Sequence, residues 1–187
     1  MDLSQLHKQI DTQTGGKQTT LPPVESWDPA FCGDINMTIK RDGRWFYEGS
    51  PIGRAALVSL FSSVIKKEND QYFLVTPVEK VGIAVEDVPF VITGWEYNQG
   101  TFTLTTQSGD QFDVDANHPI ELRQDPFSAS GTTVPYVNVR RNLWGRFHQN
   151  VYYQLIERAS YHTTDKTTQL RLSSGDYHFC LGEFEDE

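Results

Sequence analysis

Hydrophobic and polar positions alternate early in the chain, on both sides of an Asp-Gly pair. Ile35, Met37 and Ile39 alternate with polar residues, and Asp42-Gly43 separates this run from a second one that holds Trp45 and Tyr47. Alternation on both sides of Asp-Gly is typical of two antiparallel strands joined by a tight turn. The pattern therefore predicts a hairpin over residues 35–47 with a two-residue turn.

The period then changes to that of a helix. Apolar residues recur at helical spacing between positions 57 and 65, namely Leu57, Leu60, Phe61, Val64 and Ile65. Ser50-Pro51 suits the start of a helix, because Ser caps free N–H groups and Pro fits the first turn. Lys66-Lys67 suits the end, where positive charge is favourable. The stripe predicts a helix that covers the preceding hairpin.

From Tyr72 onward the period returns to two. The alternation predicts strands at 71–76, 79–86, 90–97, 101–107, 111–115, 119–123 and 136–140. Apolar positions at Phe147, Val151 and Leu155 predict a second helix over 146–159. A polar loop over 160–168 and a short hairpin around Ser174-Gly175 complete the pattern. Many short strands with turns between them indicate an antiparallel sandwich or a partly open barrel.

These elements predict an α+β protein with three parts. The first 24 residues are polar except for Leu3, Leu6 and Ile10, which predict a short helix followed by a mobile linker. We therefore expect a mobile N-terminal tail over 1–24, a small ββα domain over 25–68, and a β domain over 69–187.

Composition and charge exclude some classes of protein. Hydrophobic residues make up 37% of the 187 residues and aromatic residues 12%, which is enough apolar material for a core. The net charge of −9 argues against a nucleic-acid binder that relies on its overall charge. Residues 68–121 carry ten acidic side chains against one basic, whereas 122–175 carry seven basic against three acidic. Either the two segments neutralise each other in the fold, or the late arginines face an anionic partner.

The expected compartment is the cytoplasm. No apolar run is long enough to span a membrane, and the first residues lack the pattern of a secretory signal. Two cysteines far apart, Cys32 and Cys180, suggest reduced thiols rather than a disulfide framework.

Motifs for common chemistries are absent or weak. Gly15-Gly16-Lys17 lacks the spacing of a phosphate-binding loop. Asp113, Asp115 and Asn117 have the first spacings of a calcium loop, but the Gly and the closing Glu that such a loop needs are missing. His178 and Cys180 share one face of a strand, which could pair an imidazole with a thiolate. We expect no metal, no cofactor and no catalytic residue.

Two groups of residues are candidates for binding. Arg54 opens the first predicted helix and Glu79 stands at a strand junction, so the two could form an ion pair or bind an anion at the domain junction. Tyr136, Arg140 and Arg146 mix basic and aromatic side chains, as sites for phosphate or peptide do. In each case a purely structural role remains the alternative.

Several short motifs resemble a bacterial domain-of-unknown-function family. They are Asp42-Gly43-x-Trp45, Gly49-Ser50-Pro51-Ile52-x-Arg54, Leu57-Val58-x-Leu60-Phe61, Thr76-Pro77-Val78-Glu79-Lys80-Val81, Val85-Glu86-Asp87-x-Pro89-Phe90 and Tyr152-Tyr153-x-Leu155. The resemblance extends from about Pro23 to Gly182. It implies a small N-terminal domain packed on a larger one with a pleckstrin-homology-like fold, and a role in bacterial signal transduction. It supplies no catalytic residues, and the closing hairpin departs from a plain pleckstrin-homology domain, in which the helix comes last.

Three hypotheses about function follow. The first is a non-enzymatic binding module that recognises a small ligand, a peptide or a protein partner. The second is an enzyme on a small polar or anionic substrate, with Glu79 as general acid or base and Arg54 orienting an anion in the crevice between the domains. The third is a structural interaction protein.

Overall fold

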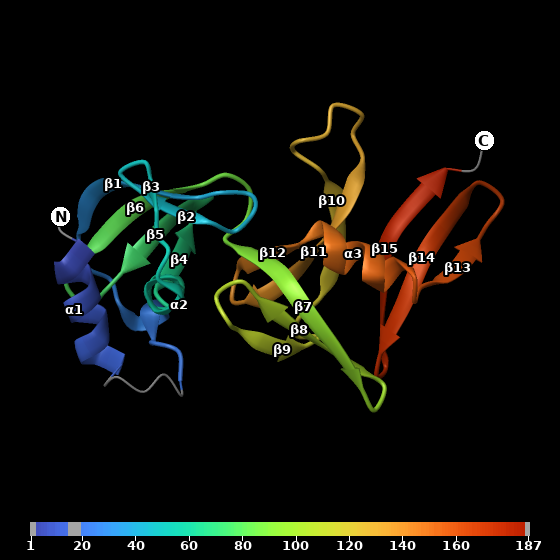
Figure 1. The fold of residues 1–187 in the computed structure, drawn as a ribbon, viewed down its shortest axis with the longest axis horizontal. Coiled ribbons are helices and arrows are strands. Elements are labelled where there is room, and N and C mark those ends of the chain that lie inside the picture. Colours follow the sequence, from blue (N-terminus) through green and yellow to red (C-terminus); the bar gives the residue numbers. More distant parts are fainter. Residues whose placement is uncertain (1–2, 15–19, 186–187) are drawn as a thin grey trace. The chain divides into compact units, whose positions relative to one another are not determined.

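The chain forms two compact units in the computed structural model, which describes residues 3–14 and 20–185. The units are Met1–Pro89 and Phe90–Glu187, called here the N-terminal and the C-terminal unit (Figure 1). The α+β class predicted from the sequence is confirmed, because helices and strands are both present in each unit.

The N-terminal unit is a mixed sheet with two α-helices. Its elements are α1 (Leu3–Thr14), the 3-10 helix η1 (Val24–Ser26), β1 (Phe31–Ile39), β2 (Trp45–Tyr47), β3 (Ser50–Pro51), α2 (Ala55–Ser62), β4 (Ile65–Glu68), β5 (Gln71–Val75) and β6 (Lys80–Val85). The sheet has the order β3-β2-β1-β6-β5-β4. Its core includes Trp45 and Phe61, whose stacked rings have centroids 6.3 Å apart.

The C-terminal unit has two sheets and one helix. Its elements are β7 (Phe90–Asn98), β8 (Thr101–Thr106), β9 (Gln111–Asp113), β10 (Ile120–Gln124), β11 (Thr133–Arg140), β12 (Leu143–Phe147), α3 (Gln149–Ile156), β13 (Ser160–Thr163), β14 (Thr167–Ser174) and β15 (Tyr177–Glu185). One sheet has the order β10-β11-β12-β7-β8-β9, and the other is β13-β14-β15.

The larger sheets of the two units have the same topology. Each contains two antiparallel meanders, and the first strand of one meander pairs in parallel with the last strand of the other. These parallel pairs are β1 with β6, and β7 with β12. The antiparallel arrangement expected from the sequence is therefore incomplete, because the central pair of each of these sheets is parallel.

A glycine occupies the third position of the last strand in both parallel pairs. Gly82 faces Asp34 across the pair in the N-terminal unit, and Gly145 faces Phe90 in the C-terminal unit. A Cβ atom on Gly145 would lie 3.2 Å from Val139 Cγ2 and 3.3 Å from Phe90 Cβ. Gly145 therefore lets neighbouring side chains close over the β12 backbone.

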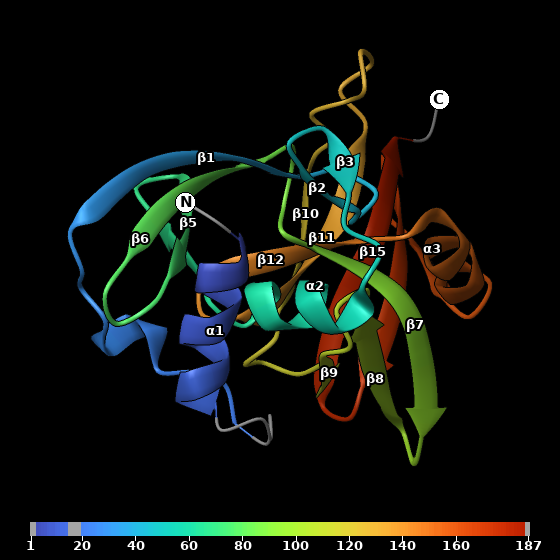
Figure 2. The same ribbon diagram turned by 60° about the vertical axis from the view of Figure 1, so that its left-hand side comes forward.

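The N-terminal segment is a packed helix over its described part. Leu6 and Ile10 are each 1% exposed, and Figure 2 shows α1 beside α2. Thr76 donates a hydrogen bond to the side chain of Gln9 at 2.9 Å. The short helix expected from Leu3, Leu6 and Ile10 is therefore present as α1, it packs within the N-terminal unit, and the expected linker lies largely outside the described residues.

The first long helix is shorter than its apolar stripe predicts. Ser50-Pro51 forms the short strand β3, and α2 begins only after its N-cap residue Arg54. Ile65 and Lys66-Lys67 belong to strand β4, which pairs with β5. The apolar stripe runs through both elements, because Leu60 and Phe61 are buried on helix α2 and Ile65 is buried on strand β4. The spacing of apolar residues therefore does not show where the helix ends.

The Asp42-Gly43 turn is longer than expected. The Lys40 N–H donates to Arg44 O across a three-residue loop, where the sequence predicts a two-residue turn.

Two strands late in the chain were also missed. Residues 143–147 form β12 and α3 begins only at Gln149, because Leu143, Gly145 and Phe147 are buried at a period of two. Residues 160–163, expected to be a polar loop, form the edge strand β13. All four residues of β13 are exposed, so no hydrophobic alternation marks this strand in the sequence.

The boundary between the units lies after Pro89 rather than after residue 68. Strands β4–β6 belong to the N-terminal sheet because β6 pairs with β1. That pairing joins segments more than 40 residues apart, so nothing in the local pattern indicates it.

We expect Gly145→Ala to destabilise the C-terminal unit by about 1–2 kcal/mol, because the added methyl group overpacks a closed contact. Urea unfolding followed by tryptophan fluorescence measures the change. Gly53→Ala is the matched control, since a Cβ there meets no atom within 4 Å. Equal stabilities of the two variants would contradict this account of the parallel pair.

Candidate functional site

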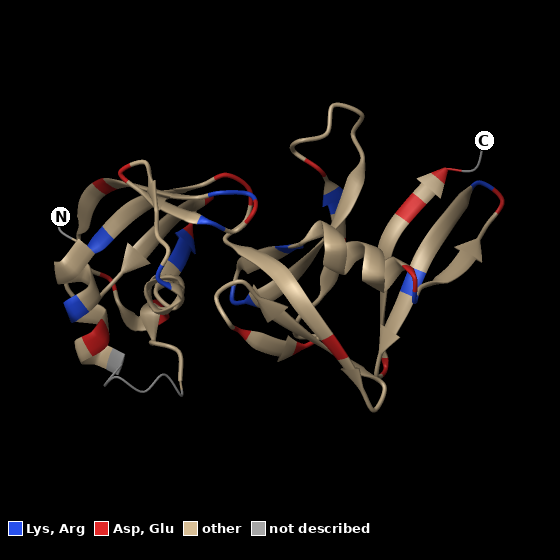
Figure 3. Ribbon diagram, viewed as in Figure 1, with Lys and Arg blue, Asp and Glu red and all other residues tan. Residues whose placement is uncertain are grey.

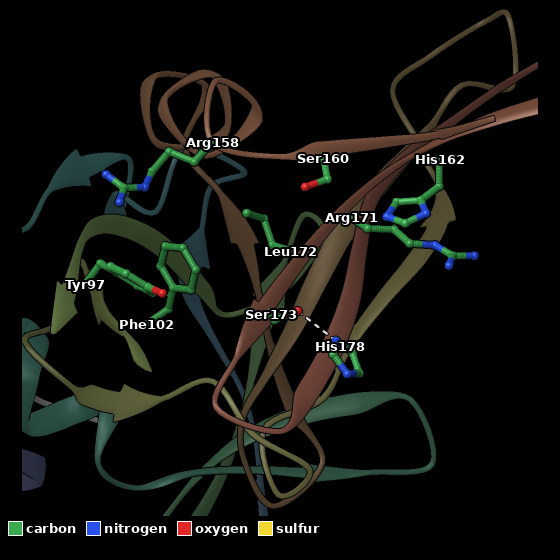
Figure 4. A pocket seen from close by; sticks show the side chains of 9 residues that line it. All are labelled: Tyr97, Phe102, Arg158, Ser160, His162, Arg171, Leu172, Ser173 and His178. Atoms are coloured by element: carbon green, nitrogen blue, oxygen red, sulfur yellow. Dashed lines mark hydrogen bonds between the residues drawn. The ribbon is translucent and has the colours of Figure 1, made fainter. Parts of the chain in front are cut away.

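A cavity of about 590 Å³ opens in the C-terminal unit (Figure 4). Its apolar lining comes from Tyr97 and Phe102 at the β7–β8 hairpin and from Leu172 on β14. Its polar lining is Arg158, Ser160, His162, Arg171, Ser173 and His178. We call this cavity the C-terminal pocket.

The pocket exists because β13 is shorter than β14. The β13–β14 pairing ends at Ser160 and Arg171, while β14 continues to Ser174. The Phe102 N–H donates to Ser174 Oγ at 2.9 Å, which ties the β7–β8 hairpin to the end of β14. The segment after α3, the free part of β14 and this hairpin thus enclose the space.

Arg158 is held in the pocket by aromatic rings rather than by a carboxylate. Its guanidinium carbon lies 5.3 Å from the centre of the Trp95 ring and 5.1 Å from that of Tyr97. Trp95 is itself fixed, because its indole N–H donates to Gln154 Oε1 at 2.9 Å. Within the described part of the chain, Arg158 has no ion pair, so its charge is not neutralised.

Arg171 is bonded to a neutral group. Its Nε and Nη2 atoms donate to Gln169 Oε1 at 2.9 and 2.6 Å. On the same face of the sheet, Ser173 and His178 pair across β14 and β15, with Ser173 Oγ 2.7 Å from His178 Nδ1. No acidic side chain lines the pocket among the described residues.

This arrangement favours binding of an anion. Two guanidinium groups without a carboxylate partner, together with hydroxyl and imidazole groups, can donate hydrogen bonds to a phosphate or a carboxylate. The Ser173–His178 pair resembles half of a nucleophilic site. However, no described acid orients the imidazole, so the pair lacks the third member of a catalytic triad.

The structure does not pair the first two predicted site residues, Arg54 and Glu79. Both lie in the N-terminal unit, and no ion pair or hydrogen bond joins them in the described residues. Arg54 is the exposed N-cap of α2. Glu79 receives no bond at its Oε2 atom, which is buried, while its backbone N–H donates to Thr76 Oγ1 at 3.0 Å.

Arg140, a predicted site residue, is largely buried and ion-paired. Its side chain is 9% exposed and donates to Asp110 Oδ1, and its guanidinium lies 4.7 Å from the centre of the Phe90 ring. Burial lowers the pKa of Arg140, and the neighbouring Asp110 carboxylate opposes that change. The late arginine here neutralises an acid of the middle segment, which was one of the two expectations from charge.

Tyr136 and Arg146 are brought together, apart from Arg140. Arg146 donates to both carboxylate oxygens of Asp125 at 2.9 Å, and its Nη1 lies 3.4 Å from the Tyr136 hydroxyl. Tyr136 is 2% exposed. Arg146 also borders a second cavity of about 360 Å³. Ligand binding by these residues remains a prediction, and both arginines have internal partners.

Sequence reasoning did not single out Arg158, Arg171 or Ser173. His178 was singled out as a partner of Cys180, but its imidazole bonds Ser173, and the Cys180 thiol donates to Gly182 O at 3.1 Å. The hairpin predicted around Ser174-Gly175 could have indicated the Ser173–His178 pair, because its register places these two residues opposite each other. The stacking of Arg158 on Trp95 and Tyr97 left no signal in the sequence.

Metal binding finds no support in the described part of the chain, where no three His, Cys, Asp or Glu residues gather. Asp115 instead closes a turn, accepting bonds from the backbone N–H groups of Asn117 and His118 at 2.8 and 3.0 Å. Among the described helices, none has the length and apolar character needed to cross a bilayer.

The fold and the pocket define a two-domain α+β protein with an open basic pocket in its C-terminal unit. Two family models match the chain, the "Domain of unknown function (DUF1285), N-terminal domain" over residues 22–88 and the "Protein of unknown function (DUF1285), C-terminal domain" over 89–181. The chain therefore belongs to the DUF1285 family, which confirms the resemblance found in its motifs. The models meet within one residue of the point where the structure divides the chain.

Two crystal structures of DUF1285 family proteins are similar to this chain. The protein from Silicibacter pomeroyi DSS-3 is 43% identical, with a TM-score of 0.77, over 89% of this chain and 90% of that one. The protein from Shewanella baltica OS155 is 29% identical, with a TM-score of 0.54, over 67% of this chain and 94% of that one. No curated protein matches the chain.

We expect Asp110→Asn to lower the free energy of unfolding by on the order of 3 kcal/mol, because it leaves the buried Arg140 charge without its partner. Chemical denaturation measures this loss. Asp42→Asn serves as control, since the Asp42–Arg44 pair is exposed and should contribute less than about 1 kcal/mol. A small effect at Asp110 would show that Arg140 is not held by this ion pair.

Proposed function

We propose that this protein is a binding module whose C-terminal pocket holds the anionic group of its ligand. The observation that carries the proposal is the state of the arginines. Arg140 and Arg146 are paired with Asp110 and Asp125, whereas Arg158 and Arg171 border an open cavity and have no carboxylate partner among the described residues.

Two arginines without a carboxylate partner are unusual in a chain that is acidic overall. The chain carries a net charge of −9, so its overall field repels anions. Arg158 and Arg171 line the same cavity from different elements, and neither guanidinium group has a carboxylate partner among the described residues. An anionic ligand in the cavity supplies the negative charge that these guanidinium groups lack, which gives the arrangement a function.

The size and lining of the pocket narrow the ligand further. A volume of about 590 Å³ lies in the range of sites for small molecules or short peptide segments. Tyr97, Phe102 and Leu172 offer an apolar wall next to the charged groups. The ligand we propose therefore has an anionic group joined to an apolar or planar part.

Titration calorimetry of the full chain with inorganic pyrophosphate tests the anion site. We expect Arg158→Gln and Arg171→Gln each to raise the Kd at least tenfold, which corresponds to about 1.4 kcal/mol. Lys8→Gln is the control, because it removes the same charge from the exposed face of α1 in the N-terminal unit. Equal Kd values for all three variants, or no binding at millimolar pyrophosphate, would overturn the proposal.

The enzyme hypothesis has one supporting observation, the buried Oε2 of Glu79 that lacks a hydrogen-bond partner. Titration of Arg54→Gln and Glu79→Gln with the same probe separates this site from the C-terminal pocket. If these variants lose binding and the pocket variants do not, the N-terminal site is favoured. A pleckstrin-homology-like fold, a cytoplasmic location and a role in signal transduction stay predictions from the sequence.

A further inference from the structure

The free part of β14 is an open strand edge inside the C-terminal pocket. Beyond Arg171, no described strand pairs with Leu172 or Ser173 on the side where β13 ends. Ser173 is exposed, and both residues line the pocket. Such an edge presents backbone N–H and C=O groups to whatever enters the pocket.

We infer that the pocket takes an extended polypeptide segment, which adds to β14 as a strand in the place that β13 leaves free. This inference rests on the proposed anion-binding function and names its ligand class: a segment that alternates acidic with apolar residues. Main-chain hydrogen bonds to β14 supply part of the affinity, as in other cases of strand addition.

The two faces of β14 dictate the alternation. Arg171, Ser173 and His178 lie on one face, because Ser173 pairs directly with His178 and side chains alternate along a strand. Leu172 points to the other face, towards Tyr97 and Phe102, as Figure 4 shows. An added strand has the same period of two, so its acidic side chains meet Arg171 and its apolar side chains meet Leu172.

Charge argues for an acidic segment rather than a neutral one. Arg171 bonds a neutral amide and no acid among the described residues, and His162 on β13 borders the same pocket. Figure 3 shows the basic residue of β14, which is Arg171, and acidic residues towards the end of β15. Glu183 on β15 accepts a hydrogen bond from the amide of Gln169.

The length of the free edge limits the number of backbone hydrogen bonds that an added strand can form with β14. The free edge consists of Leu172 and Ser173, roughly 7 Å at about 3.3 Å per residue, because Ser174 is buried and bonded to Phe102. This is too short to bind a long strand by backbone contacts alone. The side-chain contacts to Arg158 and Arg171 therefore have to select the partner, which makes the edge specific rather than a general aggregation site.

The test uses the full chain and a synthetic pool of decapeptides with Glu or Asp at odd positions and Val, Leu, Phe or Tyr at even positions. We expect binding by fluorescence anisotropy, with shifts of the Leu172 and Ser173 amide signals in NMR spectra. A matched pool with N-methyl groups on alternate amides keeps the charge but blocks strand pairing, and it should bind at least tenfold more weakly. A pool with Lys at the odd positions controls for charge.

The outcomes separate this inference from the proposed function. Equal affinity of methylated and unmethylated pools would overturn strand addition. If pyrophosphate binds in an Arg171-dependent manner and the acidic pool does not bind, the pocket serves small anions only. If neither binds, the proposed function fails as well. Arg171→Gln should weaken the acidic pool while Lys8→Gln leaves its affinity unchanged.

Discussion

Each unit of this chain depends on one parallel pairing between distant strands. In the C-terminal unit β7 pairs with β12, and this pair joins two meanders into one sheet. Phe90 and Val91 of β7 are buried there, and Gly145 lets the layers close over β12. The chain then leaves β12 through α3 into β13, and β7 leads to the hairpin with Tyr97 and Phe102. Two of the three parts that enclose the C-terminal pocket, the β7–β8 hairpin and the segment after α3, therefore start from the same parallel pair.

The distribution of charge follows from the same framework. Arg140 and Arg146 are on β11 and β12, close to Asp110 and Asp125, and they are neutralised within the unit. Arg158 lies after α3 and is held by the rings of Trp95 and Tyr97, while Arg171 is bonded to Gln169. The fold thus separates arginines with a structural partner from arginines that face a cavity. This separation is the physical basis for the proposed binding function.

Local pattern predicted most strands, because their buried residues alternate at a period of two. It failed at α2 and β4, where Leu60, Phe61 and Ile65 suit both a helical and an extended chain. It also failed at β13, an exposed edge strand without apolar alternation. The boundary at Pro89 and the pocket depend on pairings between distant segments, which no local period can reveal. Arg140 and Arg146 are close together in the sequence, so local pattern indicates them as a group. Arg158 and Arg171 line one pocket with Tyr97 only in the folded chain.

The central claim is that Arg158 and Arg171 are free to bind an anion while Arg140 and Arg146 are not. NMR of the arginine Nε–Hε groups, recorded on the full chain during a pyrophosphate titration, tests it directly. The account predicts shifts for Arg158 and Arg171 and unchanged signals for Arg140 and Arg146. Shifts at Arg140 or Arg146 alone, or no shift at any of the four, would contradict it.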